Sequence, residues 1–309
     1  MSNKTTGPAA LFGVARDAVL EVSDEAWRAQ LDAALDSALQ FERRSKQRGD
    51  GREASAAGAT AADTRDTRDG SACRVWRGCD QNVALRIQSG PSCGLVALQL
   101  AVEHVLRVRC ADDSDALLRT AVERHFSKLG EMFSAFHLAD LAAAVYGARL
   151  ASHSVSVHAL DLLADSLDAR AAWLAAAVQR GALVLLAYDA DKDNTPSATL
   201  GGSRAHWAVV KGFLAPAPAA AAPESESDSE PLRVLLDADA DAAAAVRAAD
   251  AFFVCVHSKS KRPALWRADA LLRSSAQLLR PDHARNTDSR YVMPESIAET
   301  LALKAIVIE

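Results

Sequence analysis

The spacing of apolar residues changes once along this chain, and the change limits the folds that the chain can adopt. From Cys93 to Arg180 apolar side chains recur at helical intervals, whereas beyond Gly181 they fall in short runs bounded by turn residues. Half of the residues are apolar but only 5% are aromatic, so the core is built largely from Ala, Leu and Val. These features predict an α+β fold in which a helical lobe precedes an antiparallel sheet lobe.

The same pattern predicts the individual elements. Helices are expected at 93–108, 116–129, 135–146 and 160–180, the third of them stopped by Gly147. Strands are expected at 83–87, 182–188, 206–214, 251–257, 264–266, 291–293 and 305–308.

Two stretches of low complexity divide the chain. Residues 46–72 and 215–231 hold small, proline and charged residues without large apolar side chains, a composition that cannot offset the entropy lost on ordering. We therefore expect an N-terminal tail at 1–22, an amphipathic helix at 23–45 and a disordered linker at 46–72. One folded domain at 73–309 then contains a surface insertion at 215–231.

Charge, hydropathy and cysteine content exclude several classes of protein. The formal charge of -5 leaves no basic surface of the kind that binds nucleic acid. No apolar run is long enough to span a membrane and the N-terminus lacks a secretory signal, so we expect a cytoplasmic protein with no membrane partner. The five irregularly spaced cysteines indicate free thiols, and the acidic runs lack the glycine and glutamate of a calcium loop, so neither a metal nor another cofactor is expected.

The run from Gln88 to Gly94 places a cysteine where a helix begins. Gly90 and Pro91 end the preceding strand, and Cys93 falls in the first helical turn, where unpaired backbone N–H groups and the helix dipole stabilise a thiolate. We therefore expect a lowered pKa and a nucleophilic sulfur at Cys93. The Gln88 amide can fold back beside the Cys93 backbone N–H and complete an oxyanion hole.

A thiolate nucleophile needs an imidazole partner, and His206 has the most suitable setting. It follows a glycine turn and opens an apolar strand, a rigid element that can project the ring toward the Cys93 helix. Other histidines lie within helices, beside a strand-to-helix turn or in a polar loop, at positions 104, 125, 137, 153, 158 and 283. A cysteine placed well before its histidine also matches the order found in papain-type enzymes.

A third residue commonly orients such an imidazole. Asp269 lies just past the second strand of the hairpin expected at 251–257 and 264–266, and it is the first candidate. Asp237 and Asp239 remain alternatives, because the insertion leaves the number of strands after His206 open.

Several separate runs resemble, in the same order, the actin maturation protease family. They are GPSCGLVAL around Cys93, GEMFSAFHLADLA from Gly130, AHWAVVKGFL around His206, ALWRADAL and SRYVMPES. The resemblance covers residues 80–214 and 251–295. Where the family has an aspartate-containing run after Leu-Trp, this chain has Arg267-Ala268-Asp269, and the N-terminal helix and both low-complexity segments have no clear counterpart.

The resemblance implies a papain-like or C39-like cysteine peptidase of the aminopeptidase type that removes the acetylated N-terminal residue from immature actin. It implies Cys93 as nucleophile and His206 as base, with a thioester intermediate, and the actin N-terminus, in free or profilin-bound actin, as the partner. Because that terminus is acidic, Arg204 and Lys211 near His206 are candidate binding residues. Two other functions stay open: deubiquitination or another acyl transfer on the same thiol, and a non-catalytic pseudo-peptidase that binds actin.

Overall fold

The computed structural model describes residues 75–109, 113–217, 233–236, 240–244 and 246–309, together with Ala29, Ala33, Leu35 and Gln40. These four isolated positions are helical and fall within the helix expected at 23–45, and Leu35 is fully buried in the main core. The expected tail at 1–22, the linker at 46–72 and the part of the insertion at 218–231 lie outside the described residues.

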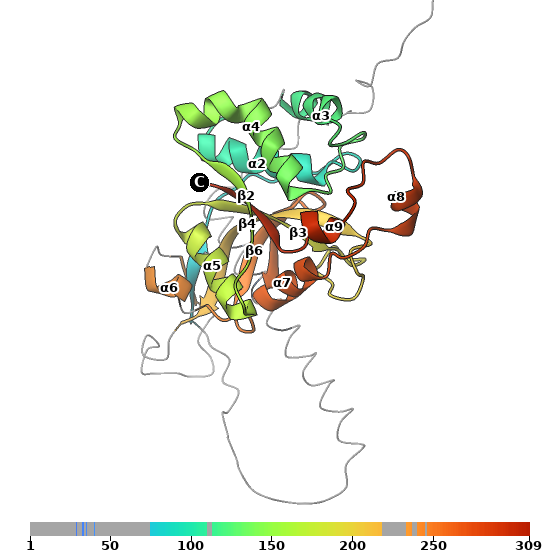
Figure 1. The fold of residues 1–309 in the computed structure, drawn as a ribbon. Helices are drawn as coiled ribbons and strands as arrows, with labels where there is room; N and C mark the ends of the chain where they lie inside the picture. Colours follow the sequence, from blue (N-terminus) through green and yellow to red (C-terminus); the bar gives the residue numbers. More distant parts are fainter. Residues whose placement is uncertain are drawn as a thin grey trace, which may run out of the picture.

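One mainly antiparallel sheet forms the centre of the described structure (Figure 1). Its strands follow the order β2 (Val157–Asp161), β8 (Lys304–Ile308), β3 (Leu183–Asp189), β4 (Ala205–Pro216), β1 (Val75–Asp80) and β5 (Arg233–Leu236). β4 also pairs with β6 (Phe252–His257), which pairs with β7 (Ala264–Arg267). All of these pairs are antiparallel except β1 with β5. The α+β class with an antiparallel sheet is thus confirmed.

The helices cover both faces of this sheet (Figure 1). On one face lie α2 (Cys93–Leu106), α3 (Asp113–Glu123) and α4 (Ala135–Ser152). On the other lie α5 (Leu167–Gln179), α6 (Ala240–Ala244) and α7 (Ala268–Ala276), and the short α8 (His283–Thr287) and α9 (Ile297–Thr300) lie at the side of the sheet. The helices are therefore divided between two layers around one sheet.

Successive side chains along a strand point to opposite faces of the sheet, and each face therefore packs against its own layer of helices. In β3, Leu183 and Leu185 belong to the core beneath α2 and α4, whereas Val184 and Leu186 belong to the core beneath α5 and α7. Every residue of β3 is buried, because both of its faces are covered. The continuous apolar run in the sequence is the signature of this arrangement.

The observed elements depart from the expected ones in a few places. α4 continues through Gly147 to Ser152. The helix predicted at 160–180 begins only at Leu167, as α5, and its first two residues belong to strand β2. The predicted strands at 83–87 and 291–293 are irregular segments, apart from a single bridge at Leu85. Strands β1 and β5 were not predicted.

Candidate active site

Helix α2 begins at Cys93, directly after a tight turn. Gly90 adopts a φ of 66°, which favours glycine, and the Ser92 hydroxyl donates to the Ser89 carbonyl at 2.8 Å. Because Ser92 is engaged in this way, its side chain does not cap α2, and no acidic residue lies in the first turn. The backbone N–H groups of Trp207 and Gly94 donate hydrogen bonds to the Cys93 sulfur.

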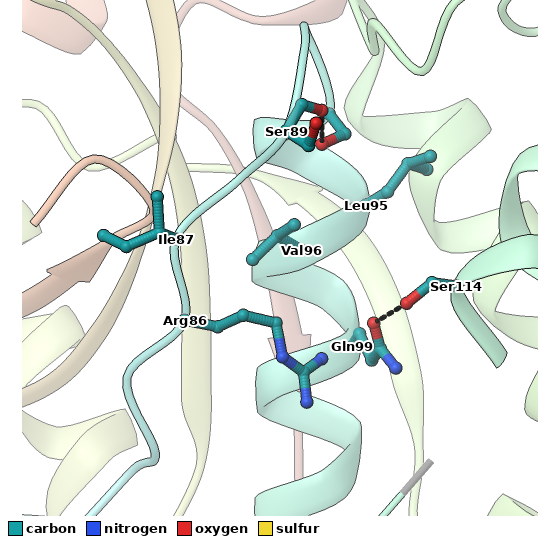
Figure 2. Close-up of a pocket in the computed structure, with 8 residues that line it drawn as sticks. Arg86, Ile87, Ser89, Leu95, Val96, Gln99 and Ser114 are labelled. Carbon is teal, nitrogen blue, oxygen red and sulfur yellow. Dashed lines mark hydrogen bonds between the residues drawn. The ribbon is translucent and has the colours of Figure 1, made fainter. Parts of the chain in front are cut away.

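The segment that precedes Cys93 runs alongside α2 (Figure 2). It is tied to that helix by the Arg86 guanidinium, which donates to both carboxylate oxygens of Glu103, at 3.1 and 2.9 Å. On another side of α2, Ser114 of α3 donates to Gln99 at 2.7 Å beside a cavity of about 20 Å³, enough for a single water. These contacts join α2 to the preceding segment and to α3.

Gly94 allows the start of α2 to approach the sheet closely. A Cβ at this position would lie 2.9 Å from Met132 Cβ and 3.1 Å from Trp207 Cδ1. The Trp207 indole N–H donates to the buried Met132 carbonyl at 2.8 Å, which locks the two contacting residues together. Cys93 is therefore held against β4, the strand that carries His206.

The position of His206 is set by a buried carboxylate at the end of β3. Asp189 is fully buried and accepts hydrogen bonds from the Gly202 N–H at 2.6 Å, the Arg204 N–H at 2.7 Å and the Gln277 amide at 2.9 Å. These bonds hold the turn that leads into β4, of which His206 is the second residue. The ring lies opposite Tyr188 of β3, with ring centroids 5.7 Å apart.

Cys93 and His206 line one cavity of about 140 Å³. Three basic side chains, Arg204, Lys259 and Arg285, line the same cavity. The remaining walls come from the turn before α2, the loop before α4, the ends of β3 and β4, and the segment after α8, namely Gln88, Pro91, Glu131, Met132, Phe133, Ala187, Ala205, Trp207 and Tyr291. The structure therefore brings the two residues chosen from the sequence to the same site.

Burial raises the pKa of the Cys93 thiol. The backbone hydrogen bonds from Trp207 and Gly94 and the charges of Lys259 and Arg285 lower it, but their combined effect is smaller. The direction is opposite to the lowering expected from the helix start, because removing the thiolate from water outweighs the dipole and the two N–H groups. The resting sulfur near neutral pH is a thiol.

Burial also lowers the pKa of His206, to about 3, and the nearby charges of Lys259, His257 and Arg285 lower it further. The imidazole is therefore neutral near pH 7 and has a lone pair free to accept a proton. Near neutral pH the Cys93 thiol and the His206 imidazole that line the cavity are thus both uncharged.

The cavity carries an excess of positive charge. Within the described part of the chain, Arg204, Lys259 and Arg285 have no ion-pair partner. Partial burial and the charges of Arg204 and Arg285 lower the pKa of Lys259. Glu131 also lines the cavity, but its two oxygens accept hydrogen bonds from its own loop and from the Val292 N–H, and its single negative charge leaves the three cations in excess.

Gln88 lines the cavity, and two hydrogen bonds fix the orientation of its side-chain amide. Its Oε1 accepts from the Ser258 hydroxyl at 2.6 Å, and its Nε2 donates one hydrogen to the Gly90 carbonyl at 2.6 Å. An amide nitrogen carries two hydrogens, so one remains for another acceptor.

The other predicted site residues lie elsewhere. Asp269 is in the first turn of α7 and forms an ion pair with Arg267 at 3.1 Å. Arg267 ends β7 and lies opposite Phe252, the first residue of β6. His257 occupies the other end of β6, so the length of a strand separates Asp269 from the cavity. Asp237 and Asp239 lie outside the described residues.

Lys211 lies in the sheet and not at the cavity. Its side chain is fully buried, donates to Asp80 in an ion pair and donates to the Gln81 carbonyl at 2.7 Å. Burial lowers its pKa to about 8, although Asp80 acts in the opposite direction. Lys211 thus joins β4 to the end of β1.

Sequence reasoning missed His257, Lys259 and Arg285. Ala208 of β4 pairs with His257 of β6, so extending this antiparallel register by two residues places Lys259 opposite His206. This neighbourhood follows from the strand register and cannot be read from the local sequence. Arg285 comes from α8, far along the chain, and no local pattern pointed to it.

Comparison with known proteins identifies the family. The family model for the actin maturation protease-like C-terminal domain matches residues 83–214. The actin maturation protease of Xenopus tropicalis is 31% identical over 221 residues, which cover 71% of this chain and 68% of the relative. This chain belongs to the actin maturation protease family.

Other members of the actin maturation protease family match in the same way. The protein of Danio rerio is 30% identical over 224 residues, covering 71% of this chain and 69% of the relative. That of Drosophila melanogaster is 28% identical over 193 residues, which cover 62% of this chain and 54% of the relative. The family model includes Cys93 and His206 but ends before His257 and Arg285.

Two further findings concern the described residues alone. No helix there combines the length and the apolar character that crossing a bilayer requires. No group of three or more His, Cys, Asp or Glu side chains there is arranged to hold a metal ion.

Proposed function

We propose that this chain is a cysteine peptidase that removes the acetylated N-terminal residue from immature actin. The observation that carries the proposal is that Cys93, at the start of a helix, and His206, near the start of a strand, line one cavity. The names of the relatives support proteolysis with actin as substrate. We further propose a papain-like fold, because a helix that starts at the nucleophile packs on an antiparallel strand that carries the base.

The proposed reaction proceeds through a thioester. The Cys93 sulfur attacks the carbonyl carbon while His206 takes the thiol proton, and His206 then gives this proton to the leaving amine. The Cys93 backbone N–H and the second N–H of Gln88 Nε2 stabilise the oxyanion. Water resolves the thioester and releases the acetylated residue. Because the resting pair is uncharged, proton transfer accompanies the attack of sulfur on the substrate.

The cations of the cavity support an acidic substrate. Arg204, Lys259 and Arg285 form no ion pair within the described residues, and a carboxylate next to the scissile bond would supply the negative charge that they lack. Lys211 takes no part in this proposal, since its charge is paired inside the sheet.

Mass spectrometry of an acetylated actin N-terminal peptide tests the proposal. We expect the wild-type protein to release the acetylated residue and the Cys93→Ala variant to leave the peptide intact. A second peptide in which amides replace the acidic side chains should be cleaved with kcat/KM lower by about tenfold or more. An unprocessed acidic peptide would reject the substrate, and equal rates on the two peptides would reject the role of the cations.

The cation proposal has a matched pair of variants. Arg285→Gln should lower kcat/KM on the acidic peptide relative to that on the amide peptide, because any effect of Arg285 on Cys93 and His206 is common to both substrates. Lys192→Gln removes an exposed lysine that does not line the cavity, and it should change neither value.

A further inference from the structure

Two buried ring nitrogens beside the cavity have no hydrogen-bond partner within the described part of the chain. They are Nε2 of His206 and Nδ1 of His257, whose side chains are 3% and 7% exposed. Buried polar atoms in folded proteins are nearly always paired, so two unpaired nitrogens in neighbouring rings call for a common explanation.

The strand register makes the two histidines neighbours. Ala208 of β4 lies opposite His257 of β6, so His206 and His257 are diagonal neighbours on the same face of the sheet. Their ring centroids are 6.2 Å apart and the ring planes meet at 77°.

Two larger aromatic rings hold this pair from the sides. The ring centroids of Tyr188 and His206 are 5.7 Å apart, and those of Trp266 and His257, which stack, are 5.4 Å apart. The centroids of Tyr188 and Trp266 are 4.7 Å apart. The four residues thus form a closed ring of contacts, so each imidazole has two aromatic neighbours.

The separation of the rings fits a bridge of one water. Ring nitrogens lie about 1 Å from the centroid, so the two nitrogens approach to about 4 Å at best, which is too long for a direct hydrogen bond and suits one bridging water. Nε2 of His206 is the buried nitrogen, which leaves Nδ1 as the one that faces the cavity.

We propose that His257 is the positioning residue of His206, and that its Nδ1 accepts, through one water, the hydrogen bond donated by His206 Nε2–H. The inference rests on the proposed Cys93–His206 pair. During attack the S–H bond breaks, its proton moves to His206 Nδ1, and the sulfur electron pair forms the bond to the carbonyl carbon. The same proton later leaves Nδ1 for the departing amine, so His257 gains and loses none.

The surrounding charges explain why a fixed acceptor is needed. The charges of Lys259 and Arg285 oppose the positive charge that His206 acquires, and Tyr188 meets the ring in a T-shaped contact while its hydroxyl donates to the Asn194 carbonyl at 3.0 Å. Asp269 lies at the far end of β6 and β7 and does not reach the ring. A neutral acceptor at His257 selects the tautomer with hydrogen on Nε2, and it leaves Nδ1 free to receive the thiol proton.

Two substitutions of similar size separate acceptance of a hydrogen bond from packing. His257→Gln keeps an acceptor, whereas His257→Met fills similar space and packs on Trp266 without one. We expect His257→Met to lower kcat on the acetylated peptide by about tenfold or more at unchanged KM. His257→Gln should retain most of the activity, and both variants should unfold thermally as single transitions. Equal losses in both variants, or no loss in His257→Met, would overturn the inference.

A second readout does not depend on the substrate. The rate at which iodoacetamide alkylates Cys93, followed by peptide mass spectrometry between pH 6 and 9, should fall in His206→Gln and in His257→Met but not in His257→Gln. If it falls in His206→Gln alone, His257 has no positioning role although the catalytic pair stands. If His206→Gln leaves it unchanged, the Cys93–His206 pair and this inference both fail.

A matched control comes from His137, whose ring stacks on Phe126 at 4.2 Å and does not line the cavity. Its Gln and Met variants should leave both readouts at the wild-type level.

Discussion

At the scale of single residues, the chemistry of the site depends on which effect dominates at each buried group. Cys93 lies at a helix start that favours a thiolate, yet its pKa is raised because burial removes it from water. His206 is kept neutral for the same reason. Alkylation of Cys93 near pH 7 should therefore depend on His206, since the thiol proton moves when the sulfur attacks an electrophile.

Asp189 gives a prediction at this scale. Its two oxygens accept from the Gly202 and Arg204 N–H groups and from Gln277, all of them buried or partly buried. Asp189→Asn replaces one oxygen by an N–H donor and leaves at least one of these donors unpaired. We expect the free energy of unfolding, measured in urea, to fall by about 1–3 kcal/mol. Because the turn before His206 shifts, kcat should also fall, by up to about 100-fold.

Asp191 is the matched control for Asp189. It lies two residues further along and also accepts backbone N–H bonds, from Asp193 and Thr195, but at an exposed position. Asp191→Asn should cost less stability and leave kcat unchanged, because water can replace the lost acceptor. Equal effects of the two substitutions would contradict the role assigned to Asp189.

The residues of the candidate site differ in how visible they are in the sequence. Cys93 follows a Gly-Pro turn and His206 follows a glycine turn, so local signals suffice to choose them. His257 ends an apolar strand and looks like any strand end until its register with β4 is known. The direction of the Cys93 pKa shift was predicted wrongly, because a sequence shows the helix start but not the depth of burial.

At the scale of elements, catalysis in the proposed mechanism depends on how closely α2 approaches β4. Gly94→Ala places a methyl group 2.9 Å from Met132 Cβ, closer than such atoms approach, so the helix start must move away from the sheet. We expect a loss of about 1–3 kcal/mol in the free energy of unfolding. The loss of peptidase activity should exceed what the unfolded fraction explains, as seen by comparing urea unfolding with initial rates.

Gly147→Ala is the control for this substitution. Gly147 lies inside α4, and a Cβ there meets no atom within 4 Å. Alanine should therefore stabilise the protein by about 0.5–1 kcal/mol and leave activity unchanged, because it only improves helix propensity. If both glycine substitutions acted in the same direction, the explanation from close packing at Gly94 would be wrong.

Local patterns predict elements well where packing agrees with them. Continuous apolar runs located β3, β4 and β6, since strands covered on both faces have no polar side. Gly147 was expected to stop α4, but the helix continues because nothing crowds the position and the following turns pack against β2 and β8. The helix expected at 160–180 included the last two residues of β2, because Leu160 fits either period, and only the pairing of β2 with β8 decides.

At the scale of the whole molecule, the sheet separates two helical layers, and the cavity lies at the edge of the sheet where β3 ends and β4 begins. α2 delivers Cys93 from one layer, and β3, β4 and β6 deliver Tyr188, His206 and His257 to the same edge. Global unfolding therefore returns the two buried imidazoles to water at the same time. This couples the pH dependence of stability to the candidate site.

The coupling gives a prediction with a definite sign. The pKa values of His206 and His257 are about 3 and about 4 in the folded protein, against 6.5 for an unperturbed imidazole. Below pH 6.5 the unfolded chain binds protons that the folded protein does not, so stability is fully present above that pH and is lost as the pH falls toward 4. At pH 5 each ring should lower the free energy of unfolding by about 2 kcal/mol relative to pH 7.5.

Urea unfolding of the wild type and of His257→Gln at pH 5, 6 and 7.5 measures this loss. The variant keeps the shape of the site but carries one titrating ring fewer, so its stability should fall less between pH 7.5 and pH 5, by about 2 kcal/mol. His153→Gln, which removes an exposed ring hydrogen-bonded to the Arg149 carbonyl, should follow the wild-type curve. A wild-type stability that is the same at pH 5 and pH 7.5 would mean that the folded and unfolded chains bind equal numbers of protons over this range. In that case the lowered pKa values of the two rings, and with them a neutral His206 at pH 5, would have to be abandoned.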